Sequence, residues 1–206
     1  MGLISLLFSD PILFVAIAAM LVFSIIAHEV SHGAMAYLFG DSTAKRYGRL
    51  TLNPISHFDP IGALMLFTVG FGWARPVPVD YGRLRRNPFA LLCVSLAGCM
   101  MNILLAIAAI FCLRFQAIAQ HPVYSQALPI IIQINIILSA FNLIPIPPLD
   151  GSKVLMSFLS SKNQIRFARL EPYGFIILIL LLLTGFLKPV IFFMEPEIYQ
   201  LINFIF

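Results

Sequence analysis

Four long apolar stretches constrain the fold of this chain more than any other feature of its sequence. They extend over residues 11–39, 89–113, 125–144 and 173–187. An α-helix needs about 20 consecutive apolar residues to cross the roughly 30 Å hydrocarbon core of a bilayer. Of the 206 residues, 60% are hydrophobic and only 11% are charged, whereas soluble domains carry about 25% charged residues. The sequence therefore predicts an all-α polytopic membrane protein with about four full transmembrane helices, in a single domain over residues 1–206.

A fifth apolar segment, residues 59–80, is interrupted by glycines and prolines. Its composition alone leaves three readings open: a re-entrant loop, a β-hairpin or a full span. Lysine and arginine accumulate in cytoplasmic loops, and eleven of the thirteen fall on one face if the segment enters and returns. A full crossing would move the cluster at Arg83, Arg85 and Arg86 to the opposite face. We therefore expect a segment that returns, with the N-terminus outside, in the plasma membrane.

The C-terminal residues 189–206 carry Glu195 and Glu197 near their middle. Two acidic side chains fit an interfacial helix on the outer face better than another span. The net charge is +4. The positions of the basic residues in predicted cytoplasmic loops account for this excess, so we expect no nucleic-acid partner. The lipid bilayer is the partner that the composition predicts.

The stretch His28-Glu29-Val30-Ser31-His32 matches the pattern H-E-x-x-H inside the first apolar helix. Ionisable groups in a membrane helix cost about 2.5 to 3.5 kcal/mol each on insertion scales, so they indicate a functional site. Positions i and i+4 lie on one face of a helix, which lets His28 and His32 reach one Zn²⁺ while Glu29 is placed to accept a proton from water. Buried histidines that only hydrogen-bond to neighbouring helices are the less favoured interpretation.

A catalytic zinc site usually has three protein ligands, and "FNLIPIPPLDG", residues 141–151, offers the third. The prolines cannot sustain a helix, which favours a polar pocket at the end of the third span. Asp150 lies there at the same predicted membrane depth as His28 and His32, near the cytoplasmic face. The alternative role for Asp150 is to cap the helix that begins at Gly151.

The two motifs together resemble the site-2 protease family of zinc intramembrane metalloproteases, in its compact type without a PDZ or CBS domain. HEVSH is followed by Asn142-x-x-Pro145-x-Pro147-x-x-Asp150-Gly151, as in the family pattern NxxPxPxxDG. The similarity extends from Ile25 to Gly174 and includes "LTLNPISHFDPIG", "GWARPVPVD" and "LAGCMMN". Cys99-Met100 departs from the family pattern but touches no expected ligand.

The resemblance implies one Zn²⁺ per chain, with His28, His32 and Asp150 as ligands. It also implies Glu29 as general base and Asn142 near the substrate or the developing oxyanion. The implied activity is hydrolysis of peptide bonds in or near the transmembrane segment of a membrane protein substrate, with a single-span helix as the expected kind. A membrane zinc carrier and a non-catalytic scaffold are the alternatives, and neither the substrate nor the oligomeric state is indicated by the sequence.

The remaining polar residues carry weaker expectations. His57 is either a loop residue that forms hydrogen bonds or a contributor to the pocket, and His121 is expected to be exposed in the outer loop. Asn102 and Asn135 would be costly in an apolar helix unless they pair across helices. The three cysteines form no metal or disulfide pattern, so we interpret them as packing residues: Cys93, Cys99 and Cys112.

Overall fold

The computed structural model describes residues 7–62 and 75–185, with a few more positions between 189 and 200. Every regular element within these ranges is a helix. The helices, in chain order, are α2 (Pro11–Leu38), α3 (Thr43–Arg46), α4 (Pro54–His57), α6 (Tyr81–Leu84), α7 (Pro88–Leu113), α8 (Gln116–Ala119), α9 (Pro122–Asn142), α10 (Asp150–Ser157), α11 (Ser161–Ala168) and α12 (Glu171–Leu183).

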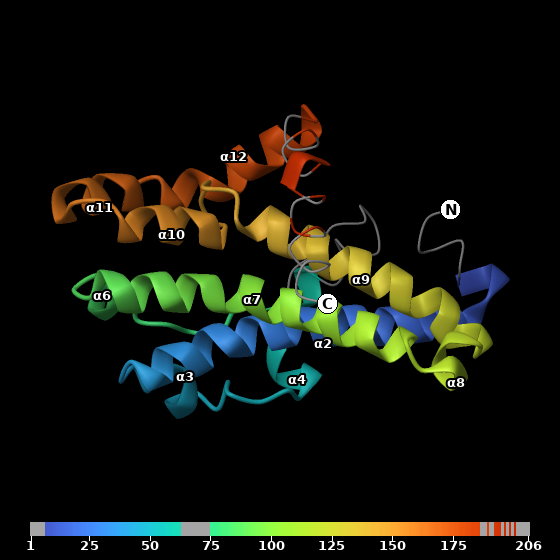
Figure 1. The fold of residues 1–206 in the computed structure, drawn as a ribbon. Coiled ribbons are helices and arrows are strands. Elements are labelled where there is room, and N and C mark those ends of the chain that lie inside the picture. The colour runs from blue at the N-terminus through green and yellow to red at the C-terminus, as the bar shows by residue number, and fades with distance from the viewer. Residues whose placement is uncertain are drawn as a thin grey trace.

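Three described helices, α2, α7 and α9, are long and apolar enough to cross a membrane, with 28, 26 and 21 residues. They lie side by side as the long body of the molecule (Figure 1). Each begins with a polar cap followed by proline: Asp10, Asn87 and His121 accept a backbone N–H of the first turn. Proline suits the first helical position because an N–H at that position would have no acceptor within the helix, so nothing is lost by its absence. The prediction of an all-α polytopic membrane protein is confirmed.

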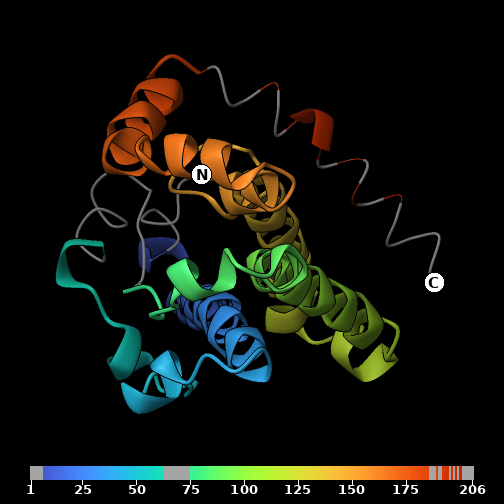
Figure 2. The same cartoon turned by 90° about the vertical axis from the view of Figure 1, so that its left-hand side faces the viewer.

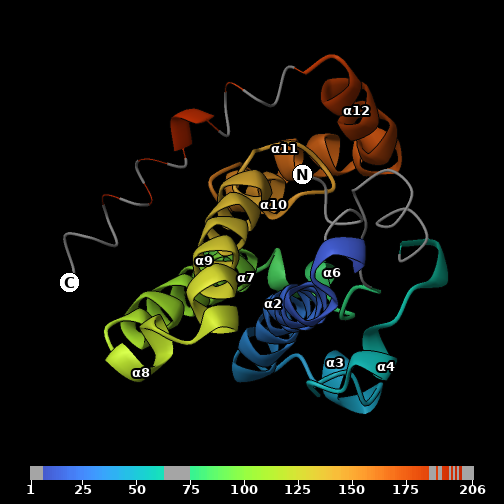
Figure 3. The ribbon, with the colours of Figure 1, turned by 90° about the vertical axis from the view of Figure 1, so that its right-hand side faces the viewer.

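Helix α7 packs against both α2 and α9, and the three helices form the core (Figures 2 and 3). The contact between α7 and α9 uses small residues, with Ala106 and Ala109 of α7 in one cluster with Ile132, Ile136 and Ala140 of α9. Small side chains let helices approach closely where no hydrophobic effect drives association in lipid. A second cluster joins α2 to α7, α6 and α10, and it lies toward the end where the metal-binding motifs are found.

The fourth predicted span, residues 173–187, is shorter than expected. Helix α12 has 13 residues and ends before Thr184 and Gly185, and Gly185 takes a positive φ of 71° that stops a helix. Thirteen residues rise about 20 Å, less than the roughly 30 Å of hydrocarbon. Among the described residues, three helices are long enough to be full spans, and residues 186 and 187 of the predicted fourth lie outside the described ranges.

The segment from residue 59 to residue 80 is described only at its two ends, because residues 63–74 lie outside the described ranges. The Arg75 N–H donates to the His57 carbonyl oxygen at 2.9 Å. The two ends of the undescribed stretch therefore lie next to each other. This is what a segment that enters the membrane and returns to the same face requires. The predicted interfacial C-terminal helix also lies mostly outside the described residues.

Candidate metal centre and active site

His28, His32 and Asp150 meet at one point, although Asp150 lies 118 residues after His32. The Nε2 atoms of the two histidines are 3.2 Å apart, and each is 3.1 Å from Asp150 Oδ2. Both histidines come from one face of α2, and Asp150 comes from the first turn of α10. All three side chains are buried. Among the described residues, they form the group of possible metal ligands that the sequence predicted.

The position of Asp150 depends on the loop that joins α9 to α10. Leu149, not Asp150, is the residue that precedes the first turn of α10, so the capping alternative does not apply. A Cβ atom on Gly151 would lie 2.5 Å from the Ile144 carbonyl oxygen and closer still to that of Leu143. Only glycine therefore lets the proline-containing loop fold back against α10 and place Asp150 beside the histidines.

The donor set fits a zinc ion. Two imidazoles and a carboxylate are usual ligands of catalytic zinc, at bond lengths near 2.0 to 2.2 Å. Ligand atoms at tetrahedral corners are then about 3.4 Å apart, close to the observed 3.1 to 3.2 Å. Burial alone would raise the pKa of the Asp150 carboxyl, but His32 and His28 hold that pKa below its ordinary value. Asp150 is therefore an anionic ligand at neutral pH.

Gly98 of α7 provides the space that the two imidazoles occupy. A Cβ atom at this position would lie 2.5 Å from His28 Cε1 and 2.6 Å from His28 Nε2, and it would also overlap the His32 ring. The His32 Nδ1 atom lies 2.7 Å from the Val94 carbonyl oxygen, one turn earlier in α7. A hydrogen bond of this kind from the second ring nitrogen orients a metal-binding histidine. Helix α7 thus shapes the site without supplying a ligand.

Glu29 lies beside the ligands, and its carboxylate accepts a hydrogen bond from the Val77 N–H at 3.0 Å. Val77 is part of an extended segment, residues 75–80, that follows the undescribed stretch. Pro76 and Pro78 on either side have no N–H, so Val77 is the backbone donor of the Pro76–Pro78 tripeptide. The segment passes directly over the residue that the motif assigns as general base.

Two side chains hold the segment 75–80 in place. Arg49 is buried, and its guanidinium donates to the carbonyl oxygens of Arg75 (2.6 Å) and Pro76 (3.3 Å). Asp41 accepts the Asp80 N–H at 2.7 Å. Burial would raise the pKa of Asp41, but hydrogen bonds from Thr43 and Asp80 lower it below its ordinary value. Asp41 is thus ionised and joins the end of α2 to the end of the segment.

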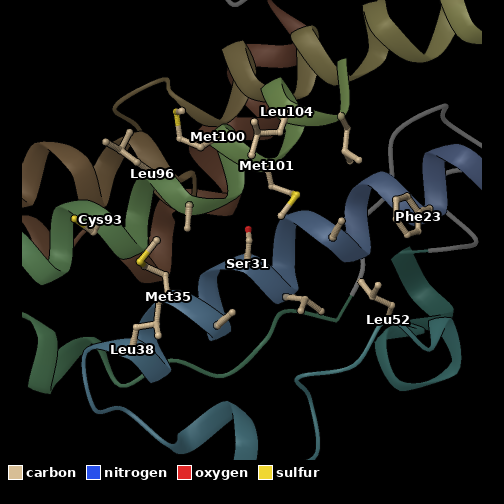
Figure 4. Close-up of a pocket in the computed structure, with 15 residues that line it drawn as sticks. Phe23, Ser31, Met35, Leu38, Leu52, Cys93, Leu96, Met100, Met101 and Leu104 are labelled. Atoms are coloured by element: carbon tan, nitrogen blue, oxygen red, sulfur yellow. The ribbon is translucent and has the colours of Figure 1, made fainter. Parts of the chain in front are cut away.

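An apolar groove of about 710 Å³ lies between α2 and α7 (Figure 4). Its lining includes Ala27, Val30 and Leu96, together with Ser31. The Ser31 hydroxyl donates to the His28 carbonyl oxygen at 2.6 Å, so it is satisfied within its own helix. The lining contains none of the ligands, and the reacting groups lie on another face of α2.

The other predicted residues take varied positions. Asn142 is the last residue of α9, and its side-chain N–H donates to the Leu138 carbonyl oxygen at 3.0 Å; a catalytic role for it stays a prediction. His57 is the last residue of α4; it is buried, and its Nε2 lies 2.8 Å from the Thr51 carbonyl oxygen, which agrees with the hydrogen-bonding alternative. His121 is exposed, as expected, and its Nδ1 caps α9.

Sequence reasoning missed three residues that shape the site: Val77, Arg49 and Gly98. Val77 acts through its backbone N–H and Arg49 through backbone acceptors, which no side-chain pattern encodes. Gly98 acts by having no side chain. The stretches "GWARPVPVD" and "LAGCMMN" contain Val77 and Gly98, and they were the available signals.

Comparison with known proteins gives consistent matches. The model of peptidase family M50 matches residues 113–185. A Bacillus subtilis (strain 168) protein named as a zinc metalloprotease, YwhC, is 39% identical over 171 residues, which are 80% of this chain and 78% of that protein. Rip2 of Mycolicibacterium smegmatis, named in the same way, is 30% identical over 179 residues, 83% of this chain and 68% of that protein. No solved structure matches the chain.

Proposed function

Because the chain belongs to peptidase family M50, the site-2 protease family, we propose that it hydrolyses peptide bonds in or near the transmembrane segment of single-span membrane proteins. The protein is a membrane-embedded zinc metalloprotease. The observation that carries this proposal is the convergence of His28, His32 and Asp150 on one point beside Glu29, inside a bundle of apolar helices. A zinc carrier needs polar or acidic residues that lead from the metal site to both membrane faces. The three ligands hold a metal but do not by themselves form such a route.

Each of the chain's own residues has a role in this proposal. Zinc, when bound by His28, His32 and Asp150, supplies a Lewis acid that polarises the scissile carbonyl and lowers the pKa of water. Glu29 accepts the proton of the attacking water and passes it to the leaving amine. Asn142 is proposed as a donor to the developing oxyanion. For this, its side chain must turn from the Leu138 carbonyl oxygen toward the substrate.

Substrate presentation is proposed to use the extended segment 75–80. A transmembrane helix satisfies its carbonyl groups internally, so it must unwind before attack. An extended peptide can be held by pairing with an exposed backbone edge. The segment passes over Glu29 through Val77, so a strand paired with it would lie beside the ligands.

We further propose that the N-terminus lies outside the plasma membrane and that the active site lies near the cytoplasmic face. The basic residues of the described loops support this orientation. All of them except Arg114 lie at the end of the bundle that holds the loops 39–53 and 75–87 and helices α10 and α11 (Figure 1). The ligands are in the half of α2 nearer that end.

The variant Glu29→Gln tests the proposal. An amide keeps the volume of the side chain but has no useful basicity, and loss of a positioned general base costs about 10²- to 10⁴-fold in rate. Co-expression with a panel of tagged single-span proteins should show cleavage by the wild type only. The variant should retain zinc, because Glu29 is not a ligand.

The matched control is Ser31→Ala, in the same helical turn, which removes only a hydroxyl bonded within α2 and should leave cleavage intact. Normal cleavage by Glu29→Gln would refute the assigned mechanism. A wild-type protein that binds no zinc would refute the metal centre itself.

A further inference from the structure

A layer of buried polar side chains crosses the three-helix core close to the metal ligands. It consists of Ser24 of α2, Asn102 of α7 and Asn135 of α9, and we refer to these three residues as the polar layer. Their exposed fractions are 1%, 0% and 0%. Asn135 Nδ2 donates to Ser24 Oγ at 3.0 Å, which confirms the expected pairing of Asn135 across helices.

The polar layer lies one helical turn from His28, at the next level of contact between α2 and α7. The two helices are antiparallel, and the His28 ring packs on Gly98. One turn further along each helix, four residues from His28 and from Gly98, are Ser24 and Asn102. A turn rises about 5.4 Å, so the layer lies immediately beyond the His28 ring, on the side of the bundle away from Asp150.

Four of the seven buried side-chain polar atoms that lack a hydrogen-bond partner among the described residues belong to His28 and to the polar layer. Within the described residues, His28 Nδ1, both side-chain polar atoms of Asn102, and Asn135 Oδ1 have no hydrogen-bond partner. His32, in contrast, has its Nδ1 atom 2.7 Å from the Val94 carbonyl oxygen. An unsatisfied buried group costs about 1 to 3 kcal/mol, and a metal-binding histidine nearly always donates its second N–H. His28 therefore needs an acceptor, and Asn102 has both an acceptor and a donor to offer.

We propose that Asn102 and Asn135 hold one buried water molecule that accepts the Nδ1–H of His28. A buried water needs two to four polar partners, and the ring nitrogen with the two asparagine side chains supplies them. The hydrogen bond fixes the tautomer in which His28 Nε2 carries a lone pair toward the metal. Asn102 is thus a positioning residue for a metal ligand. The inference rests on the proposed zinc site, but not on the identity of the substrate.

A purely structural role for Asn102, as a contact between helices, predicts different behaviour. Asn102→Ala would then be the more harmful change, because it leaves a cavity, while Asn102→Leu fills the space. The water-mediated role predicts the reverse order for zinc affinity. Alanine leaves room for water to reach His28, whereas leucine excludes water and leaves the Nδ1–H without an acceptor.

The experiment measures zinc dissociation constants by chelator competition on the full-length protein in detergent. Asn102→Leu should bind zinc about 10- to 100-fold more weakly than wild type, the range found when such supporting hydrogen bonds are removed. Asn102→Ala should show a smaller loss. The metal-free Asn102→Leu protein should still show a cooperative thermal unfolding transition, which distinguishes a loss of zinc affinity from a loss of the fold.

The matched control is Ser139→Ala, which removes a buried interhelical hydrogen bond to the Cys99 carbonyl oxygen (3.2 Å) without touching the polar layer. It should keep wild-type zinc affinity. In a His28→Ala background, Asn102→Leu should have no further effect, since it acts through His28.

Three results would overturn the inference: wild-type zinc affinity in Asn102→Leu, equal losses in Ser139→Ala, or a full additional loss in the His28→Ala background. If Asn102→Leu does not fold, Asn135→Leu takes its place with the same criteria. Absence of zinc binding in the wild type would instead overturn the proposed metal centre, so the two failures are distinguishable.

Discussion

Gly98→Ala should weaken zinc binding at least about 100-fold, although it adds a single methyl group at a position that belongs to neither metal-binding motif of the sequence. The methyl carbon would lie 2.5 Å from His28 Cε1 and 2.6 Å from His28 Nε2. Ordinary van der Waals contact begins near 3.4 Å. Helix α7 is held between α2 and α9, so the imidazoles must move, and they must move by about 1 Å.

The size of the loss follows from the tolerance of metal coordination. Zinc–ligand distances vary by only about 0.2 Å, so a displacement near 1 Å removes His28 from the coordination shell, and the neighbouring His32 is disturbed as well. A misplacement of about 1 Å costs about 100-fold in a catalytic geometry, and we expect at least that loss in zinc affinity. The helix itself should tolerate the change, because alanine is favoured over glycine by about 1 kcal/mol in a helix.

Zinc content by mass spectrometry and metal-free thermal stability together test this expectation. Gly33→Ala is the matched control: it makes the same change next to His32, but its methyl group meets Val77 (2.6 Å), Leu50 (2.8 Å) and Ala44 (3.0 Å), none of which is a metal ligand. The control should retain zinc. Full zinc occupancy in Gly98→Ala would contradict the reasoning, since the imidazoles and the methyl group cannot share the space.

Two further predictions concern the third ligand and the topology. Asp150→Ala should lose most of its bound zinc, because the metal then keeps two of its three protein ligands; retention of full occupancy by this variant, with loss in His28→Ala, would show that another residue is the third ligand. Cysteines placed at Ser42, Arg86 and Ser160, in a chain without its native cysteines, should react with a membrane-impermeant reagent only from the cytoplasmic side; labelling of position 86 from outside would mean that the chain crosses the membrane between His57 and Arg75.

The two histidine ligands and the long helices were predictable because each depends on local chemistry. An i, i+4 pair of histidines shares one face in any helix, and the Asp-Pro and Asn-Pro pairs at residues 10–11 and 87–88 begin helices by the same rule wherever they occur. The fourth span was not predictable from apolar content. Its end depends on the positive φ of Gly185, and apolar residues alone do not fix where a helix stops.

The contacts that surround the ligands could not be predicted from the sequence, for a different reason. The contact between Glu29 and the Val77 N–H joins residues 48 apart in the chain, and any residue except proline could supply that donor. Asn102 was expected to pair across helices, yet both its polar atoms lack a partner among the described residues. Such contacts depend on how the helices pack against one another, and a local sequence pattern does not determine that packing.

The 118 residues that separate His32 from Asp150 also impose an order on how this protein can mature. When the first helix enters the bilayer during synthesis, its histidines have no carboxylate to meet, because Asp150 has not yet been made. The metal can be captured at full strength only after α9 has been inserted and α10 has folded back. Hydrolytic chemistry therefore cannot begin until the chain has been synthesised as far as α10 and Asp150 has reached the two histidines.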